Sequence, residues 1–190
     1  MQNVLIVASI LISLIAPVVG VRAILKGEYK PQRITRLIFL IVTSLFVLTL
    51  LAQNDRTALF LAFAQFFGSL CIFVLSLKYG VGGTSKMDII VFICAMGSLI
   101  VWKTTDNAVL GLYASILTDF IGFLPTLIKA WRKPSTEVWL YYACDVVAGL
   151  LNILALKTFL FNEVVFPVYI LLVNLAITLI LLYKKRNITR

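Results

Sequence analysis

The chain has 190 residues, of which 62% are hydrophobic and only 13% are charged, and its formal net charge is +9. A water-soluble domain of this length cannot bury so much apolar surface, because its own surface must still be covered by polar groups. The composition therefore excludes an ordinary soluble domain and predicts an all-α polytopic membrane protein with lipid as its solvent.

Apolar runs of about 17–25 residues match the hydrocarbon thickness of a bilayer when they are helical. The sequence contains seven such runs, and we expect transmembrane helices at residues 3–25, 35–52, 57–78, 87–102, 107–130, 137–156 and 163–183. Only short turns lie between them, so no soluble domain is expected. The first run lacks a basic n-region and a small-residue cleavage pattern, and we expect a helix there rather than a signal peptide.

Positive charge gathers in alternate gaps between these runs. The first, third and fifth gaps and the tail hold most of the 17 Lys and Arg residues: Arg22, Lys26, Lys30, Arg33, Arg36, Lys78, Lys86, Lys129, Arg132, Lys133, Lys184, Lys185, Arg186 and Arg190. The other gaps hold Arg56, Lys103 and Lys157. The positive-inside rule then predicts a multi-pass protein integral to the cell membrane, with the N-terminus outside and the C-terminus in the cytoplasm.

Several classes of protein lack support in the sequence. Cys71, Cys94 and Cys144 lie singly in different apolar runs, and the chain has no histidine. We therefore expect no metal site and no cofactor. A phosphate-binding GxxxxGK[ST] loop and a nucleophile with an adjacent base are absent, so no enzyme activity is expected. The expected partners are a small-molecule substrate and membrane lipids, not a nucleic acid, and a homo-oligomer is left open.

The second half of the chain repeats features of the first. In each half an Ala-Ser-Ile-Leu tetrapeptide is followed by a proline, a basic residue, a second proline and an apolar run. These are residues 8–11, Pro17, Arg22 and Pro31 in the first half, and residues 114–117, Pro125, Lys129 and Pro134 in the second. Two three-helix units in the same orientation need one extra crossing between them. We expect parallel three-helix bundles at residues 1–80 and 105–190, joined by a linker helix at residues 81–104.

The stretch Gly-Phe-Leu-Pro-Thr-Leu-Ile-Lys at residues 122–129, followed by a basic Ser/Thr-containing turn at residues 132–137, resembles the PQ-loop and SWEET superfamily of seven-helix membrane transporters. Asn174 is similar to the asparagine that SWEET sugar transporters place in their pocket. Val18 and Thr126 stand after the two prolines, where the name-giving glutamine is usual, which indicates a remote branch. The resemblance implies a 3 + 1 + 3 helix topology and transport of a small polar solute.

Two acids, Asp119 and Asp145, lie inside apolar runs, where a charge costs about 2.5–3.5 kcal/mol, so both should face protein or water. On helices their faces also carry Ser115, Gly122 and Thr126 for the first acid, and Tyr141, Ala148, Gly149 and Asn152 for the second. Either these faces line a cavity that binds a cation, exchanges a proton or accepts hydrogen bonds from a substrate, or the two acids only fasten their helices together.

Other polar residues complete the expected site. The expected substrate-binding residues are Asp145, Asn174, Asp119, Gln65, Asn152, Tyr141 and Ser69. Pro17 and Pro125 each remove a hydrogen bond inside a helix, so each is expected either to act as a hinge or only to kink its helix.

The expected function is transport of a sugar or another small polar metabolite by alternating access between the two bundles. An ion or proton channel of the same design is an alternative, and current that continues without a conformational cycle would identify it. A non-transporting receptor or scaffold is a third candidate, although the short loops leave little surface outside the membrane.

Overall fold

The computed structural model describes residues 2–31, 33–80 and 86–188. The described residues form helices and no strand. The helices are α1 (Gln2–Leu25), α2 (Arg33–Gln53), α3 (Arg56–Tyr79), α4 (Lys86–Thr105), α5 (Ala108–Arg132), α6 (Trp139–Leu154) and α7 (Phe161–Ile188), with a short 3-10 helix, η1 (Pro134–Thr136), before α6. The seven expected helices are thus confirmed as helices.

The helix ends differ from the expected ones where apolar character and helical structure do not end together. The expected seventh helix stopped at residue 183, but α7 extends to Ile188 through Lys184, Lys185 and Arg186. Lysine and arginine are good helix formers, so a charged segment continues the helix beyond the apolar run. The expected sixth helix began at residue 137, whereas α6 begins at Trp139 because the chain first turns through η1.

Five helices, namely α1, α2, α3, α5 and α7, are long and apolar enough to cross a membrane. The other two are apolar but shorter: α6 has 16 residues, and the apolar stretch of α4 is Ile89–Thr105. This architecture suggests a membrane protein, as the composition predicts.

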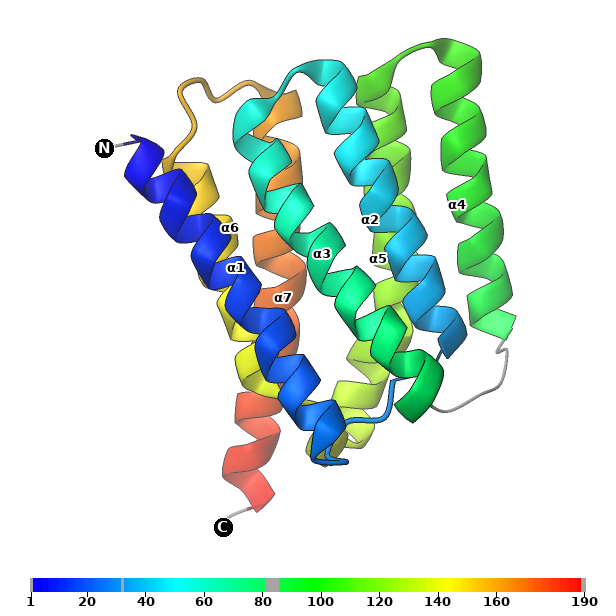
Figure 1. Cartoon of the computed structure of the whole chain (residues 1–190), viewed down its shortest axis with the longest axis vertical. Coiled ribbons are helices and arrows are strands. Elements are labelled where there is room, and N and C mark those ends of the chain that lie inside the picture. Colours follow the sequence, from blue (N-terminus) through cyan, green and yellow to red (C-terminus); the bar gives the residue numbers. More distant parts are fainter. Residues whose placement is uncertain (1, 32, 81–85, 189–190) are drawn as a thin grey trace.

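Successive helices run in opposite directions, and the two ends of the chain lie at opposite ends of the bundle (Figure 1). The packing has a simple order. Helix α3 contacts both α1 and α2, and α7 contacts both α5 and α6. The two groups meet where α1 packs against α6 and where α2 packs against α5. Helix α4 lies at the outside against α5 and α2.

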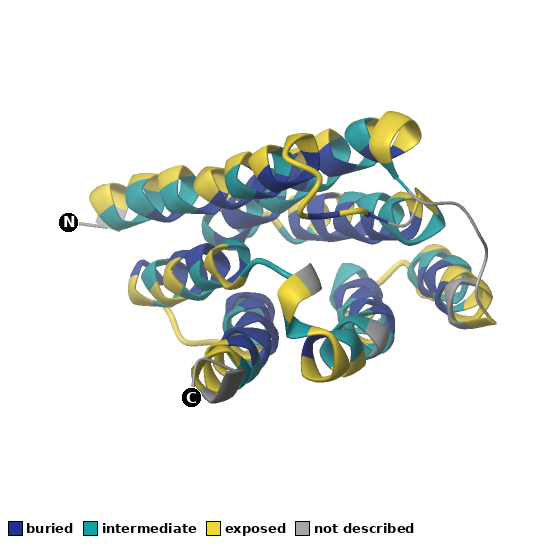
Figure 2. Cartoon of the chain, turned by 90° about the horizontal axis from the view of Figure 1, so that it is seen from below, coloured by how far each residue is buried: buried dark blue, intermediate teal, exposed yellow. Residues whose placement is uncertain are grey.

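Buried and exposed residues divide each helix into two faces. Buried faces turn toward neighbouring helices and exposed faces turn outward (Figure 2). Many outward side chains are large and apolar, and more than half of the surface of each of these is exposed: Leu11, Phe67, Ile93, Leu117 and Leu172. An apolar surface of this extent marks a face that meets lipid or another protein.

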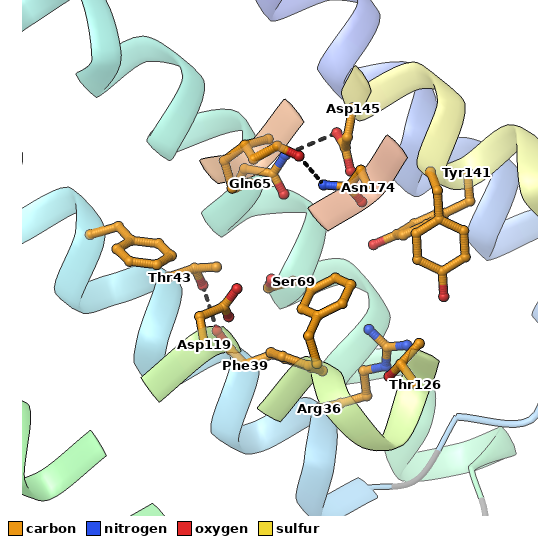
Figure 3. Close-up of a pocket in the computed structure, with 14 residues that line it drawn as sticks. Arg36, Phe39, Thr43, Gln65, Ser69, Asp119, Thr126, Tyr141, Asp145 and Asn174 are labelled. Atoms are coloured by element: carbon orange, nitrogen blue, oxygen red, sulfur yellow. Dashed lines mark hydrogen bonds between the residues drawn. The ribbon is translucent and has the colours of Figure 1, made fainter. Parts of the chain in front are cut away.

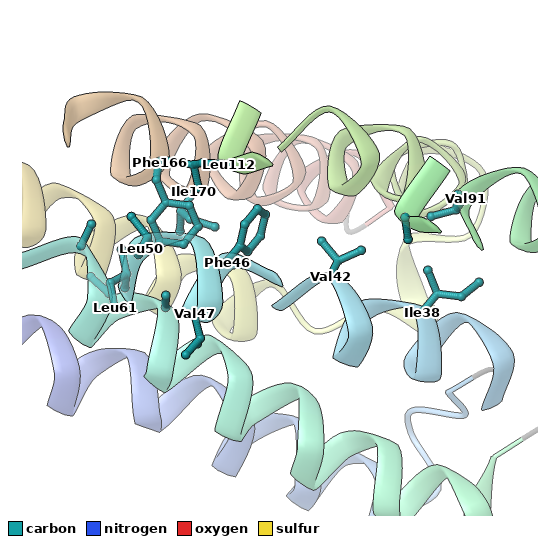
Figure 4. Packing of buried hydrophobic residues seen from close by; sticks show 14 residues of the cluster. Ile38, Val42, Phe46, Val47, Leu50, Leu61, Val91, Leu112, Phe166 and Ile170 are labelled. Carbon is teal, nitrogen blue, oxygen red and sulfur yellow. The ribbon is translucent and has the colours of Figure 1, made fainter. Parts of the chain in front are cut away.

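The largest apolar cluster among the described residues joins α2, α3, α4, α5, α6 and α7 (Figure 4). Phe46 of α2 and Phe166 of α7 pack with their ring centroids 4.8 Å apart. Leu50, Leu61 and Leu112, which surround this pair, are fully buried. The part of the cluster around Phe46 and Phe166 lies between the described cavity and the turn that joins α2 to α3, while Ile38, Val42 and Val91 extend the cluster toward the other end of the bundle.

Helix α3 begins at Asp55, whose side chain caps the helix. Its Oδ1 accepts hydrogen bonds from the backbone N–H groups of Thr57 at 3.2 Å and Ala58 at 3.1 Å. Such a cap satisfies N–H groups that have no partner inside the helix. Burial raises the pKa of the Asp55 carboxyl above its ordinary value, with the two backbone donors lowering it and the charge of Glu163 raising it further.

Helices α6 and α7 approach each other closely at Gly149. A Cβ atom at this position would lie 3.2 Å from the Leu171 Cβ and from two backbone atoms, the Leu171 nitrogen and the Pro167 oxygen. Backbone cannot move aside as a flexible side chain can, so the absence of a side chain sets the distance between the helices. At Gly97 of α4, by contrast, an added Cβ would meet nothing within 4 Å.

We predict that Gly149→Ala lowers the free energy of unfolding by about 1–3 kcal/mol, the usual cost of overpacking. Gly97→Ala adds the same methyl group to open space and is the matched control, so its thermal midpoint in detergent should not fall. Equal midpoints for the two variants would contradict the close approach of α6 and α7.

We also predict a pH-dependent effect of Asp55→Asn, which keeps the cap but removes the acid. Because the folded pKa of Asp55 is raised, the folded protein keeps this proton to a higher pH than the unfolded chain, and stability falls as the pH rises through that range. The thermal midpoint of Asp55→Asn relative to the wild type should therefore increase from about pH 4 to about pH 7. Asp106→Asn, at an exposed turn of the same end, is the control, and a pH-independent difference would refute the prediction.

Candidate functional site

A polar cavity lies among α2, α3, α5, α6 and α7 (Figure 3). About 50 Å³ of it is open to the centres of water molecules, which is room for roughly three to five waters. Six of the residues expected from the sequence line it: Gln65, Ser69, Asp119, Tyr141, Asp145 and Asn174. The wall also includes Arg36, Phe39, Thr43, Phe46, Phe123, Thr126, Tyr142 and Ile170.

Asp145 is held by side chains from two other helices. Gln65 Nε2 of α3 donates a hydrogen bond of 2.9 Å to Asp145 Oδ1, and Ser13 Oγ of α1 donates to the same oxygen at 3.5 Å. The carboxyl is almost completely buried, with 4% of the residue exposed. Since a buried carboxylate needs hydrogen-bond donors, these contacts tie α6 to α1 and α3.

Asp119 has a different partner on another helix. Tyr169 of α7 donates its hydroxyl to Asp119 Oδ2 at 2.6 Å. The two acids therefore bond to helices other than those that carry them, rather than simply fastening α5 to α6. Both acids are part of the cavity wall as well, so their hydrogen bonds do not place them in dry helix contacts.

Asn174 is positioned by its own helix. Its Nδ2 donates to the Ile170 carbonyl at 2.8 Å, and Thr178 Oγ1 donates to the Asn174 carbonyl at 2.8 Å. The amide is thus fixed against α7 while it lines the cavity, across from Gln65 of α3 (Figure 3). A fixed amide offers both a donor and an acceptor to a bound solute.

Arg36 brings a positive charge to the wall. Its guanidinium hydrogen-bonds to the hydroxyl of Tyr29 and lies 5.4 Å from the centroid of the Tyr29 ring and 5.6 Å from that of Phe39. The cavity also contains two carboxyls, two amides and several hydroxyls. It therefore combines positively and negatively charged groups with neutral hydrogen-bond donors and acceptors inside an apolar bundle. Such a site can bind a small polar solute through hydrogen bonds and ion pairs.

The remaining expected residues lie elsewhere. Asn152 is fully buried, but it is outside the described cavity wall and its Nδ2 donates to the Thr57 carbonyl at 3.0 Å, which joins α6 to the start of α3. Pro17 lies inside α1 with its ring against Gly68 of α3. Pro125 falls within the span of α5, but its side chain lies outside the described residues. Among the described residues no group of three or more His, Cys, Asp or Glu could hold a metal ion.

The charged wall residue Arg36 and the Asp119 partner Tyr169 were not among the expected site residues. Arg36 had been counted only as a loop charge, although it lies on the same helical face as Phe39 and Thr43, three and seven positions later. That spacing is the signal that could have found it. Tyr169 gave no such signal, because a tyrosine in an apolar helix has no pattern that distinguishes a buried hydroxyl from an interfacial one.

Comparison of the chain with protein-family models, with curated proteins and with solved structures finds no match in any of the three. The function is therefore inferred from the residues of this chain and their geometry.

We predict that Gln65→Leu destabilises the protein by about 1–3 kcal/mol, because it removes the 2.9 Å donor from a buried carboxyl. In a double-mutant cycle with Asp145→Leu, the losses should be strongly non-additive, since the double variant leaves neither the Gln65 amide nor the Asp145 carboxyl without its partner. Gln53→Leu is the control, because its amide donates only at 3.4 Å near the end of α2. Additive losses from Gln65→Leu and Asp145→Leu would refute the coupling.

Proposed function

We propose that the chain is a membrane transporter that carries a small polar solute by alternating access between two three-helix bundles. The observation that carries this proposal is a cavity lined by ionisable and amide side chains at the junction of the two halves, inside a bundle whose outer faces are apolar.

The packing order supports two equivalent bundles. If α1, α2 and α3 are exchanged for α5, α6 and α7, the contacts of α3 with α1 and α2 become those of α7 with α5 and α6. The contact of α1 with α6 likewise becomes that of α5 with α2. Two parallel repeats related by an axis along the membrane normal would pack in this way. The pattern favours bundles at residues 1–80 and 105–190, with α4 as the linker.

The cavity wall supports the same equivalence. Helix α2 contributes Phe39 and Thr43, four residues apart, and α6 contributes Tyr141 and Asp145 with the same spacing. Helices α3 and α7 do likewise, with Gln65 and Ser69 on one and Ile170 and Asn174 on the other. When the Ala-Ser-Ile-Leu tetrapeptides at residues 8–11 and 114–117 are aligned, Ser13 of α1 corresponds to Asp119 of α5. Corresponding helix faces from each half therefore meet at the cavity, and both carboxyls come from the second half.

Charge supports the orientation. The C-terminal ends of α1, α3, α5 and α7 and the N-terminal ends of α2, α4 and α6 lie at one end of the bundle (Figure 1), and most of the 17 basic residues belong to or lie next to these helix ends in the sequence. We call this the basic end. The positive-inside rule places it in the cytoplasm, with the N-terminus of the chain outside.

The resemblance to the PQ-loop and SWEET superfamily agrees with these features and favours a sugar or a similar polar metabolite as the solute. Asn174 lines the cavity, where the resemblance implies a substrate-binding asparagine. The cavity holds only a few waters, so a metabolite would bind in a state in which the halves have moved apart at one end.

An ion or proton channel is the second candidate, because the cavity contains two carboxyls whose hydrogen-bond partners, Gln65, Ser13 and Tyr169, are all neutral. Purified protein in a planar bilayer separates the two functions. A channel gives continuous current under a proton or sodium gradient, whereas a transporter of neutral solute gives uptake into proteoliposomes without such current.

We predict that a thermal-shift screen of purified protein against sugars, amino acids, vitamins and cations finds a stabilising ligand, since a ligand that binds only the folded state adds about 2.7 kcal/mol of stability at one hundred times its Kd. Asp145→Ala and Asn174→Ala should each weaken that stabilisation by at least about tenfold in apparent Kd and abolish uptake of the same solute into proteoliposomes.

The matched control is Ser98→Ala. Ser98 is also buried and pairs with Thr118 at 2.8 Å between α4 and α5, outside the described cavity wall. This variant should bind and transport as the wild type does. Full ligand stabilisation and uptake in both Asp145→Ala and Asn174→Ala would overturn the assignment of the cavity as the binding site.

A further inference from the structure

Three hollows follow one another from the central cavity to the basic end. Arg36, Tyr141 and Tyr142 line both the central cavity and a small neighbouring hollow of about 10 Å³. Glu137 and Val138 line both that hollow and a vestibule of about 470 Å³ at the basic end. The small hollow holds about one water molecule, so the side chains that line it separate the central cavity from the vestibule at the basic end.

A compact polar network lies at this small hollow. Glu137 is the centre of it, with only 5% of its side chain exposed. Lys129 Nζ lies 2.8 Å from Glu137 Oε1, and the Tyr142 hydroxyl donates to Glu137 Oε2 at 2.7 Å. Both oxygens of the carboxylate are therefore engaged by groups on α5 and α6.

The Tyr29 ring connects this network to the first half of the chain. The Arg36 guanidinium lies 5.4 Å and the Lys129 ammonium 5.7 Å from the ring centroid, within the range of a cation–π interaction. Arg36 also hydrogen-bonds to the Tyr29 hydroxyl. Tyr29 and Arg36 belong to the first half, whereas Lys129, Glu137 and Tyr142 belong to the second. Movement of the halves apart at this end would separate Lys129 from Tyr29, whereas the contacts of Glu137 with Lys129 and Tyr142 would stay within the second half.

The opposite end is closed in another way. A vestibule of about 500 Å³ near Asn54 and Lys157 shares no described wall residue with the central cavity. The fully buried apolar cluster around Phe46 and Phe166 lies between them. Opening that end requires many apolar side chains to leave their contacts, and each loses the stabilisation of burial. Opening the basic end separates Lys129 from the Tyr29 ring and Val138 from the small apolar cluster that contains Tyr29, beside a water-accessible vestibule.

We propose that Tyr29, Arg36, Lys129, Glu137 and Tyr142 form a polar gate at the basic end, and that this gate opens more readily than the apolar closure at the other end. The inference rests on the proposed function, since it identifies one of the two closures that alternating access requires. Glu137 holds Lys129 in place within the second half, and Lys129 contacts the Tyr29 ring of the first half, to which Arg36 is also bound.

The test measures access to the cavity rather than transport. Ser69→Cys places a thiol on the cavity wall of a protein in which Cys71, Cys94 and Cys144 are replaced by alanine. A membrane-impermeant methanethiosulfonate is added to sealed vesicles of each orientation. Exposed positions at the two ends, Lys26→Cys and Lys157→Cys, show in separate samples which end faces the reagent.

Glu137→Gln keeps the size of the side chain and an acceptor for Tyr142 but loses the ion pair with Lys129. It should raise the rate of labelling at position 69 about fivefold or more from the basic end and leave the rate from the other end unchanged. Glu163→Gln is the matched control at the opposite end, where Glu163 accepts a hydrogen bond from Thr158. This control should not change the rate from the basic end.

Tyr142→Phe removes only the hydroxyl that reaches Glu137 and provides an independent folded variant, with an increase in the same direction. Size-exclusion profiles and thermal midpoints establish that each variant is folded. An unchanged rate in folded Glu137→Gln or Tyr142→Phe, or an equal increase from both ends, would overturn the gate. Labelling needs no solute, so a gate can be established even if no transported solute is found, and transport can be found even if these variants label like the wild type.

Discussion

The structure depends on the rule that a polar group inside an apolar bundle must find its partner within the protein. Asp145 meets this rule through Gln65 and Ser13, which lie on two other helices. Asp119 meets it through Tyr169. The contacts of Asp145 fix how helices from the two halves stand relative to one another, whereas the Asp119–Tyr169 bond joins α5 to α7 within the second half. The polar cavity is therefore formed by contacts that also hold the bundle together.

The two ends of the cavity differ in the kind of contact that closes them. Apolar packing around Phe46 and Phe166 has no directional requirement and loses stability in proportion to the surface that is opened. The contacts around Glu137 are directional and lie next to a vestibule, where water can replace each lost partner. At the apolar end, the packed side chains must lose their contacts together. At the basic end, water can replace the polar contacts one by one.

The helices were predictable because apolar runs of membrane-spanning length are a strong signal. The side chains that each polar residue contacts on other helices were not predictable. Asp119, Asp145 and Asn174 could be identified as candidate site residues, since polar groups are rare in such helices, and all three line the cavity. Asn152 looked equivalent to them along the helix face that carries Asp145, but it lies about two turns further along α6, where its amide donates to the Thr57 carbonyl instead. Helix periodicity identifies a face but not its neighbour, so the roles of Arg36 and Tyr169 depended on tertiary contacts that no single helix encodes.

Helix α6 has 16 residues and is therefore about 24 Å long, whereas the hydrocarbon layer of a typical bilayer is about 30 Å thick. This hydrophobic mismatch lies on the helix that carries Asp145 and follows the 3-10 turn beside Glu137. In a membrane, headgroups and water would reach deeper beside α6 than beside its longer neighbours, or the bilayer would thin there. The length of the lipid acyl chains would thereby act directly on α6, the helix that carries Asp145.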